Sequence, residues 1–106
     1  MTDASMDPRY CQRFHRAIEL LGRRWNGAII VALGAGAMRF TDLRNTIPGI
    51  SDRLLGQRLR ELESERIVHR VVSPDGSSAA YELTDKGTAL DPVIASVSDW
   101  ADVYAP

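Results

Sequence analysis

The sequence predicts a mainly α-helical domain with one small β-hairpin, which places it in the α+β class. Apolar residues recur at three- and four-residue spacing over most of residues 8–67, as they do along one face of a helix. The pattern changes at residues 68–83, where two strand-like runs flank a cluster of turn-forming residues. A helical pattern returns at residues 84–104. With 106 residues, 44% of them hydrophobic and 25% charged, residues 1–106 have the composition of one globular domain.

Two helices and a short extended piece are expected first. Asp7-Pro8 suits an N-cap followed by proline at the first helical position, and Gly22 ends that helix. A second, strongly apolar helix runs from about residue 25 to residue 33 and stops at the turn-forming residues 34–36. Residues 38–40 are predicted to be extended.

The next two helices are joined by a tight turn. Thr41 is the expected N-cap of a helix through Ile47, which Pro48-Gly49 interrupts. Ser51 then caps a longer helix within residues 50–67. Together they predict a helix-turn-helix at about residues 41–66.

A hairpin and a last helix complete the prediction. The hairpin covers about residues 67–83, with strands at 68–72 and 79–83 around a turn that contains Pro, Asp and Gly. Thr84 caps a final helix over about residues 84–104, which Pro92 either kinks or restarts. Five helices with a hairpin behind the helix-turn-helix predict a winged helix-turn-helix.

The longer helix of this pair separates into two faces when it is wound at 3.6 residues per turn. One face gathers Leu54, Leu55, Leu59 and Leu62. The other carries Arg53, Gln57, Arg60 and Ser64. Arginine can donate two parallel hydrogen bonds to guanine and glutamine can pair with adenine, so this face is a candidate reader of the major groove. The simpler interpretation is a solvated helix face.

Further candidate DNA contacts surround that face. Base or near-base contacts are expected from Arg53, Gln57 and Arg60, with Arg53 first because it lies nearest the helix N-terminus. Phosphate contacts are expected where helices begin, at Arg39, Thr41 and Ser51, although the two hydroxyls suit capping equally well.

Two weaker candidates lie at the edges. Arg58 borders the leucine face, so its stem is expected to pack while its head reaches a phosphate or an acid. Ser77 and Ser78 at the hairpin tip could touch the DNA backbone or minor groove. The tip has Asp75 and no Lys or Arg, so such a contact should be weak.

The net charge of −1 hides an uneven distribution. Residues 1–70 carry twelve arginines against eight acids (+4), whereas residues 71–106 carry one lysine against six acids (−5). Because partner choice follows the local field, the basic part favours a nucleic-acid partner.

Several other classes of protein are disfavoured. No apolar run approaches the roughly 18 residues of a spanning helix, the first residues do not resemble a secretory signal, and one cysteine fits a reducing cytoplasm. The chain has no phosphate-binding glycine loop, zinc-binding His pair or nucleophile elbow, so neither an enzyme nor a cofactor is expected. His15 and His69 are far apart, which makes a metal site improbable.

Taken together, these residues resemble the HxlR-type transcriptional regulators, relatives of the MarR-type winged helix proteins. The marks of the resemblance are Cys11, AIELLGRRW at 17–25, RFTDLRNTIPGIS at 39–51, LLGQRLRELE at 54–63, YELTDKG at 81–87 and the last helix to Trp100. The resemblance implies a cytoplasmic bacterial homodimer that binds a near-palindromic operator in double-stranded DNA. It also implies a dimer interface of the first and last helices and, in many members, a response to oxidants or electrophiles.

This chain departs from the family pattern at three places. Gln12 follows the cysteine where members usually have Pro, and Ala79-Ala80 replaces Val-Glu in the wing. Arg66 stands where members usually have Gly after the recognition helix. A left-handed conformation there would cost on the order of 1 kcal/mol, which favours a different exit from the helix.

The resemblance makes Cys11 the candidate redox sensor, although a lone cysteine at helical apolar spacing also suits simple packing. The expected dimer interface joins Phe14 and Ile18 of the first helix to Leu90, Val97, Trp100 and Tyr104 of the last. Two alternatives remain open. The wing fold could serve as a protein-interaction module, or the regulator could respond to a small-molecule effector with Cys11 inert.

Overall fold

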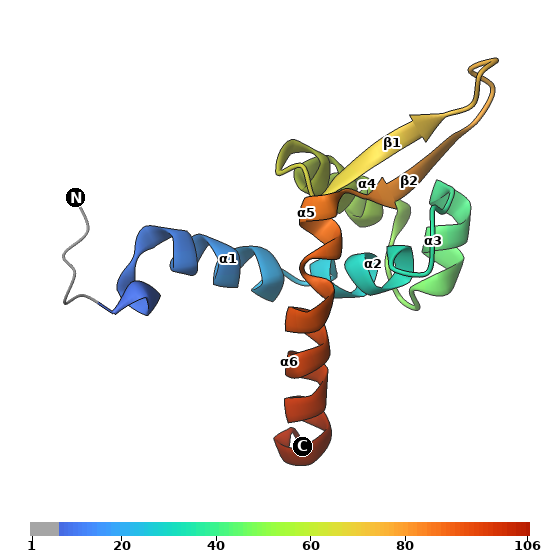
Figure 1. Cartoon of the computed structure of the whole chain (residues 1–106). Helices are drawn as coiled ribbons and strands as arrows, with labels where there is room; N and C mark the ends of the chain where they lie inside the picture. Colours follow the sequence, from blue (N-terminus) through green and yellow to red (C-terminus); the bar gives the residue numbers. More distant parts are fainter. Residues whose placement is uncertain (1–6) are drawn as a thin grey trace.

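The computed structural model describes residues 7–106 and confirms a mostly helical chain with one antiparallel hairpin (Figure 1). The elements in chain order are the 3-10 helix η1 (Pro8–Tyr10), α1 (Gln12–Gly22), α2 (Asn26–Leu33), α3 (Phe40–Thr46), α4 (Asp52–Ser64), β1 (Val68–Val72), β2 (Ala79–Leu83), α5 (Asp85–Thr88) and α6 (Asp91–Tyr104).

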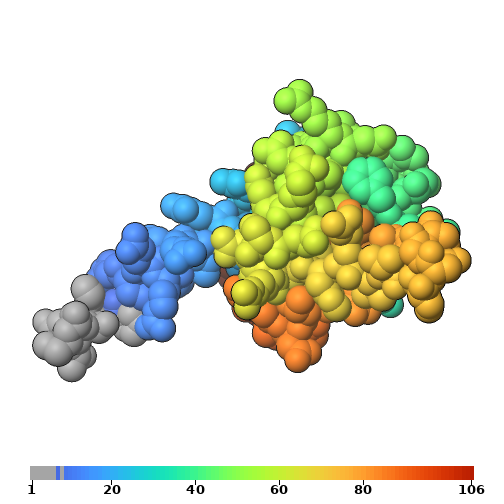
Figure 2. Space-filling model, turned by 90° about the horizontal axis from the view of Figure 1, so that it is seen from above, coloured from blue at the N-terminus to red at the C-terminus, as the bar shows by residue number. Residues whose placement is uncertain are grey.

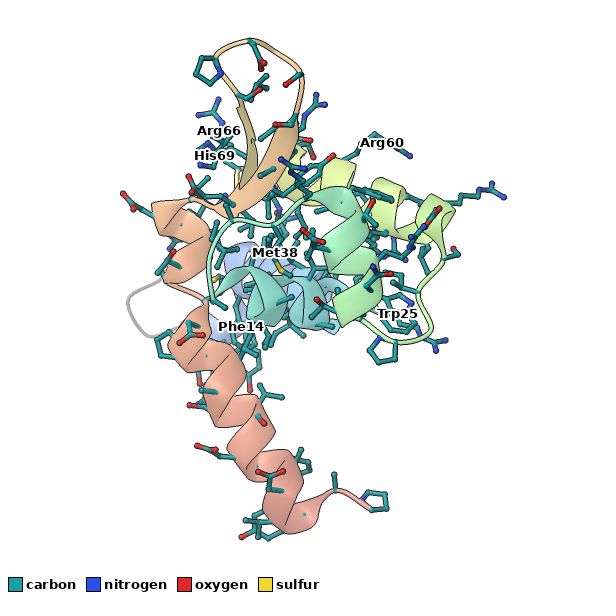
Figure 3. All side chains as sticks on the ribbon, turned by 90° about the vertical axis from the view of Figure 1, so that its right-hand side faces the viewer. Phe14, Trp25, Met38, Arg60, Arg66 and His69 are labelled. Atoms are coloured by element: carbon teal, nitrogen blue, oxygen red, sulfur yellow. The ribbon has the colours of Figure 1, made fainter. Side chains whose placement is uncertain are left out.

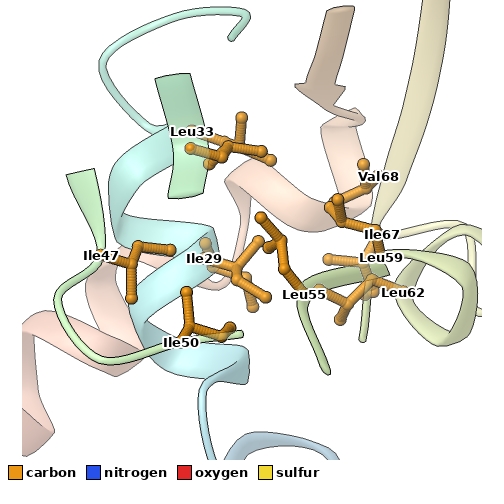
Figure 4. Packing of buried hydrophobic residues seen from close by; sticks show 11 residues of the cluster. Ile29, Leu33, Ile47, Ile50, Leu55, Leu59, Leu62, Ile67 and Val68 are labelled. Atoms are coloured by element: carbon orange, nitrogen blue, oxygen red, sulfur yellow. The ribbon is translucent and has the colours of Figure 1, made fainter. Parts of the chain in front are cut away.

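The core lies between α2, α3, α4 and the start of β1 (Figure 4). α2 is apolar on nearly every side, and this composition suits a helix that other elements cover. The buried side chains are Ile29, Ile30, Leu33, Leu43, Ile47, Ile50, Leu55, Leu59, Leu62, Ile67 and Val68. Burial of each large aliphatic side chain contributes about 1.5–3 kcal/mol, so this cluster fixes how α3 and α4 sit on α2.

α4 is closed at both ends by local hydrogen bonds. The Ser51 hydroxyl accepts from the Leu54 N–H at 3.1 Å, which confirms the predicted N-cap. At the other end Arg66 is left-handed (φ 60°), and the Arg66 and Ile67 N–H groups donate to the carbonyls of Glu63 and Leu62. This is the Schellman arrangement, which glycine normally serves. The expectation of a different exit was therefore wrong, because the buried Ile67 holds the strained turn in place.

The hairpin has the predicted strands and pairs Val68 with Leu83 through to Val72 with Ala79. The expected extended piece at residues 38–40 is shorter than predicted. Met38 alone pairs with Tyr81, because Phe40 already begins α3. This isolated bridge anchors the segment before α3 to the wing.

Two element boundaries differ from the sequence prediction, and at a third the predicted restart at Pro92 is confirmed over a kink. The first helix is interrupted at Cys11, the N-cap of α1, so Asp7-Pro8 begins only a 3-10 turn. Thr41 is not an N-cap, since Arg39 takes that position and Thr41 lies inside the first turn of α3. The last helix divides at Leu90 and restarts with Pro92 in its first turn, which gives six α-helices rather than five within residues 7–106.

Two helices leave the rest of the molecule in different directions (Figure 1). We call α2 to α5 with the hairpin, residues 26–88, the body, and we call residues 8–22 and 91–104 the two arms. Every residue of α1 and α6 keeps part of its surface exposed. None of the helices in residues 7–106 is long and apolar enough to cross a lipid bilayer.

Candidate nucleic-acid interface

The outer face of α4 carries the three predicted base-contacting residues, Arg53, Gln57 and Arg60, all of them exposed. They stay exposed because Leu55, Leu59 and Leu62 on the inner face are buried. α4 and the hairpin lie side by side on the face seen in Figure 2. Figure 3 shows Arg60 reaching outward while Met38 points into the body. Two guanidinium groups and one amide are therefore presented together beside the wing.

A glycine brings α3 and α4 close together below this face. A Cβ at Gly56 would lie 3.4 Å from Nη1 of Arg60 and 3.9 Å from the Phe40 ring. The side-chain amide of Gln57 makes only one weak polar contact within residues 7–106. Its Nε2 lies 3.5 Å from Oε1 of Glu61, at the limit of a hydrogen bond.

The N-terminal end of α4 is tied to α3 by an ion pair that the sequence analysis missed. Nη1 of Arg44 lies 3.1 Å from both carboxylate oxygens of Asp52. Both side chains are partly exposed, so the pair contributes little stability, but it fixes the entry of α4 relative to α3. Only contact between the helices creates this pair, because its members are eight positions apart.

Arg58 does not belong to the exposed face. Its side chain is 14% exposed, and Nε donates to the Arg24 carbonyl at 3.0 Å while Nη1 pairs with Glu61 at 3.1 Å. Burial opposes ionisation of Glu61, but hydrogen bonding from Arg23 and the charges of both arginines outweigh it, so the pKa of Glu61 lies below its ordinary value. The guanidinium of Arg58 is thus engaged inside the molecule, and we correct its assignment as a DNA contact.

Arg24 and Trp25 connect α1 to the helix-turn-helix. Trp25 is left-handed (φ 80°), and the Arg24 guanidinium lies 4.8 Å from the centroid of its ring. A Cβ at Gly49 would be 3.6 Å from the indole, so Trp25 packs beneath the turn between α3 and α4.

The remaining phosphate candidates lie at the starts of α3 and α4. Arg39 and Thr41 are exposed at the start of α3, and Arg39 makes no capping bond with its side chain. The Ser51 hydroxyl accepts the capping hydrogen bond from the Leu54 N–H, so its O–H and the backbone N–H of Ser51 can both donate to a phosphate.

The hairpin tip is organised around a carboxylate. Asp75 accepts hydrogen bonds from the hydroxyls of Ser73 and Ser77, both at 2.7 Å, and from the Ser77 N–H at 3.0 Å. These bonds lower the pKa of Asp75 to about 2. The N–H of Ser78 donates to the Ser73 hydroxyl. The hydroxyl of Ser77 is therefore turned toward Asp75, and the tip presents negative charge.

Cys11 lies at the N-terminus of α1. The N–H of Phe14 favours the thiolate, burial opposes it, and Arg13 adds its positive charge, so the pKa of Cys11 is lowered. The sulfur approaches these N–H groups too loosely to cap the helix. Cys11 is a free, half-buried cysteine. The neighbouring positive charge of Arg13 suits a reactive thiol better than an inert, packed one.

The candidate dimer residues are exposed in the chain by itself. The exposed fractions are 39% for Phe14, 54% for Ile18, 60% for Val97, 61% for Trp100 and 70% for Tyr104. The Trp100 and Tyr104 rings lie 5.6 Å apart. Leu90 differs, since it is partly buried against the core.

Two helices joined by a tight turn, an outward face of Arg, Gln and Arg on the second, and a hairpin beside them define a winged helix-turn-helix of the DNA-binding class. Residues 20–106 match the HxlR-like helix-turn-helix family. The chain belongs to this family and is an HxlR-type transcriptional regulator.

Relatives and solved structures agree with this assignment. The HTH-type transcriptional regulator YodB of Bacillus subtilis is 45% identical over 95 residues, which cover 89% of this chain and 85% of YodB. The reduced form of YodB superimposes with a TM-score of 0.82, covering 89% of this chain and 93% of that one. The redox regulator HypR in its reduced form is 30% identical, with a TM-score of 0.79 and coverage of 87% and 92%.

Proposed function

We propose that this regulator binds a near-palindromic operator as a homodimer, with α4 of each subunit in the major groove and the wing beside it. The observation that carries the proposal is the outward projection of Arg53, Gln57 and Arg60 from a helix whose other face is locked into the core. Two such helices related by a twofold axis would read half-sites about one helical turn apart. The site of action is the chromosome, hence the cytoplasm.

The exposed residues divide into those that contact bases and those that contact phosphates. Arg53 lies in the first turn of α4 and enters the groove first, where it donates to guanine, while Gln57 and Arg60 follow along the same face. Arg39 and Thr41, with the backbone N–H at Ser51, hold phosphates. Ser77 and Ser78 contribute little, because Asp75 repels phosphate from the wing tip.

The two arms supply the dimer interface. The apolar face of α1 with Phe14 and Ile18 packs against the face of the partner's α6 that carries Val97, Trp100 and Tyr104. Aromatic side chains of this size dominate the energy of interfaces, and leaving them in water is costly. Leu90 packs against the core at the N-cap of α6 rather than in the dimer interface.

Cys11 is the proposed sensor of oxidants or electrophiles. Solved structures of the relative YodB include a quinone-bound and a diamide-treated form, and HypR has been solved in reduced and oxidised forms. In this chain Cys11 is the single cysteine, so its thiolate has three routes. It adds to an electron-poor carbon, it displaces a thiolate from a small disulfide to form a mixed disulfide, or, with the sensed oxidant taking up two electrons, it forms a disulfide with the same cysteine of the partner subunit. The modified residue would lie at the root of the dimer interface, where a small shift misaligns both recognition helices.

The test is operator binding by purified protein after selection of genomic fragments. Arg53→Ala should weaken operator binding by roughly 1–3 kcal/mol, because a bidentate base contact is lost. Arg53→Lys keeps the charge and should lose most of the same energy, whereas Arg9→Ala, outside α4, should bind normally.

Fluorescence anisotropy on operator and random duplexes separates the outcomes. An equal loss on random DNA would mean that Arg53 touches phosphate only. Binding that does not weaken steeply with added salt would instead favour a protein-interaction module.

A further inference from the structure

A hollow lies between α1 and the C-terminal end of α4. Its volume is about 620 Å³, within the range of small-molecule sites in proteins. α1, the end of α4 and α5 line it with Arg13, Arg16, Leu20, Ser64, Glu65 and Lys86. The three base-contact candidates Arg53, Gln57 and Arg60 are not among its walls, and neither is Cys11.

The hollow uses a different side of α1 from the proposed dimer interface. Arg13, Arg16 and Leu20 follow one another at spacings of three and four and share one face of the helix. Phe14 and Ile18 belong to another face, more than a quarter turn away at 100° per residue. Pairing of the arms through Phe14 and Ile18 therefore leaves the hollow open.

The rim of the hollow suits an anion. No carboxylate of residues 7–106 forms an ion pair with Arg13 or Arg16. Lys86 also lines it, with its ammonium donating to the Glu65 carbonyl at 2.7 Å rather than to an acid. Glu19, Glu61 and Glu65 also line the hollow. Glu61 is already paired with Arg23 and Arg58, so Glu19 and Glu65 are the carboxylates that offset part of this charge. Arg16, together with Arg13, whose side chain also acts on the Cys11 thiol, is therefore without a carboxylate partner among the residues that the structure describes and can hold the carboxylate of a ligand.

The floor is apolar and contains one unsatisfied acceptor. Ala17, Leu20, Ile67 and Leu90 provide hydrocarbon surface for a flat ring. Asn26 lines the same hollow and is fully buried, with Nδ2 donating to the Leu20 carbonyl at 2.9 Å. Its Oδ1 accepts no hydrogen bond from the described part of the chain. A buried acceptor without a donor is destabilising, and a ligand hydroxyl that donates to it would remove that cost.

We propose that this hollow binds a small aromatic carboxylate that carries a hydroxyl group. Arg13 and Arg16 hold the carboxylate, the apolar floor covers the ring, and the hydroxyl donates to Oδ1 of Asn26. Such a ligand bridges α1 and the end of α4, so it couples the arm to the recognition helix. That regulatory consequence rests on the proposed function, whereas the binding itself does not.

The test uses 6-hydroxy-2-naphthoate as the probe and the amide NMR spectrum of the full chain as the readout. Saturable shifts are expected in α1, the end of α4 and α5. 2-Naphthoate, without the hydroxyl, and 2-naphthol, without the carboxylate, should each bind about tenfold more weakly, the effect of one lost polar contact.

Matched variants localise the site. Arg13→Ala with Arg16→Ala should weaken the probe at least about tenfold, and Ser64→Trp should fill the hollow and abolish binding. Arg9→Ala removes one positive charge from the same arm outside the hollow and should bind the probe normally. Asn26→Ser, if it folds, should erase the preference for the hydroxylated probe.

Three results would overturn the proposal: no saturable binding at millimolar probe, binding that survives Ser64→Trp, or shifts centred on Phe14, Ile18 and α6. Operator affinity measured without the probe reports separately on the proposed function. A protein that binds its operator but not the probe refutes only the ligand site. A protein that binds the probe but no DNA refutes only the regulator.

Discussion

The body and the two arms differ in how much of their apolar surface is buried within the chain. In the body, the inner face of α4 is completed by α2 and α3, and Leu55, Leu59 and Leu62 are almost fully buried. In the arms, Val97, Trp100 and Tyr104 remain mostly exposed although they form an equally regular stripe. The same helical periodicity thus marks a face that is buried within the chain in the body and a face that is still exposed to solvent in the arms. Substitutions in the body should therefore act on folding, and substitutions in the arms should act on assembly.

The largest effect is expected when a charged residue replaces an exposed apolar residue of α6. Val97→Asp should leave the chain folded, because Val97 is 60% exposed, but should weaken dimerisation by about 100-fold by burying a carboxylate. Operator affinity should fall with it, since each subunit alone reads only a half-site. Sedimentation equilibrium and circular dichroism measure the two effects.

Ala95→Asp is the matched control, because Ala95 is exposed on the opposite side of α6. It should dimerise normally. A Val97→Asp protein that remained fully dimeric would remove α6 from the interface.

The corresponding test in the body is a single methyl group. A Cβ at Gly87 would lie 2.2 Å from the Ile67 carbonyl oxygen, so Gly87→Ala forces α5 away from β1. We expect a loss of roughly 2–3 kcal/mol in the free energy of unfolding, measured by urea denaturation at fixed protein concentration.

Gly27→Ala is the control for that loss. Gly27 is inside α2 and a Cβ there meets nothing within 4 Å, so alanine should stabilise by up to about 1 kcal/mol. Equal changes in the free energy of unfolding for the two variants would show that the short distance between residue 87 and the Ile67 carbonyl does not destabilise the alanine variant.

Local features of the fold were predictable from sequence because they depend on neighbours in the chain. The two strands were predicted at their observed bounds, and Ser51 is the N-cap expected from its position before a leucine-rich helix. The helix boundary at Cys11 was missed, since apolar periodicity runs through it, whereas the restart at Asp91-Pro92 was one of two outcomes expected for the last helix. Pattern alone does not distinguish a continuous helix from two that share a direction.

The candidate site was only partly predictable for the same reason. The outward direction of Arg53, Gln57 and Arg60 follows from helical spacing and was confirmed. The inward engagement of Arg58 depends on the Arg24 carbonyl, 34 positions away, and the bond from Asn26 to the Leu20 carbonyl depends on the corner between α1 and α2. Such contacts exist only after the helices have packed.

Strain at the end of α4 offers a smaller test within the body. Arg66 is left-handed, so Arg66→Gly should raise the free energy of unfolding by about 1 kcal/mol without changing any buried contact. Glu65→Gly, one residue earlier in a right-handed conformation, should instead lower it by about 0.5–1 kcal/mol. Opposite signs in urea denaturation would confirm the Schellman ending, and a loss of stability in both variants would contradict it.

The smallest expected effect concerns the thiol in the first arm. The pKa of Cys11 is lowered chiefly by the Phe14 N–H, against a burial effect that raises it, with Arg13 as the only side chain that assists. Arg13→Ala should therefore raise the pKa, so that the pH of half-maximal alkylation by iodoacetamide moves upward while part of the lowering remains. Arg16→Ala removes an equal charge one helical turn away and should leave the pH profile of alkylation unchanged, because Arg16 does not act on the sulfur. If both variants shift the profile alike, the general positive field of α1, rather than the pairing of Arg13 with the thiol, sets the reactivity of Cys11.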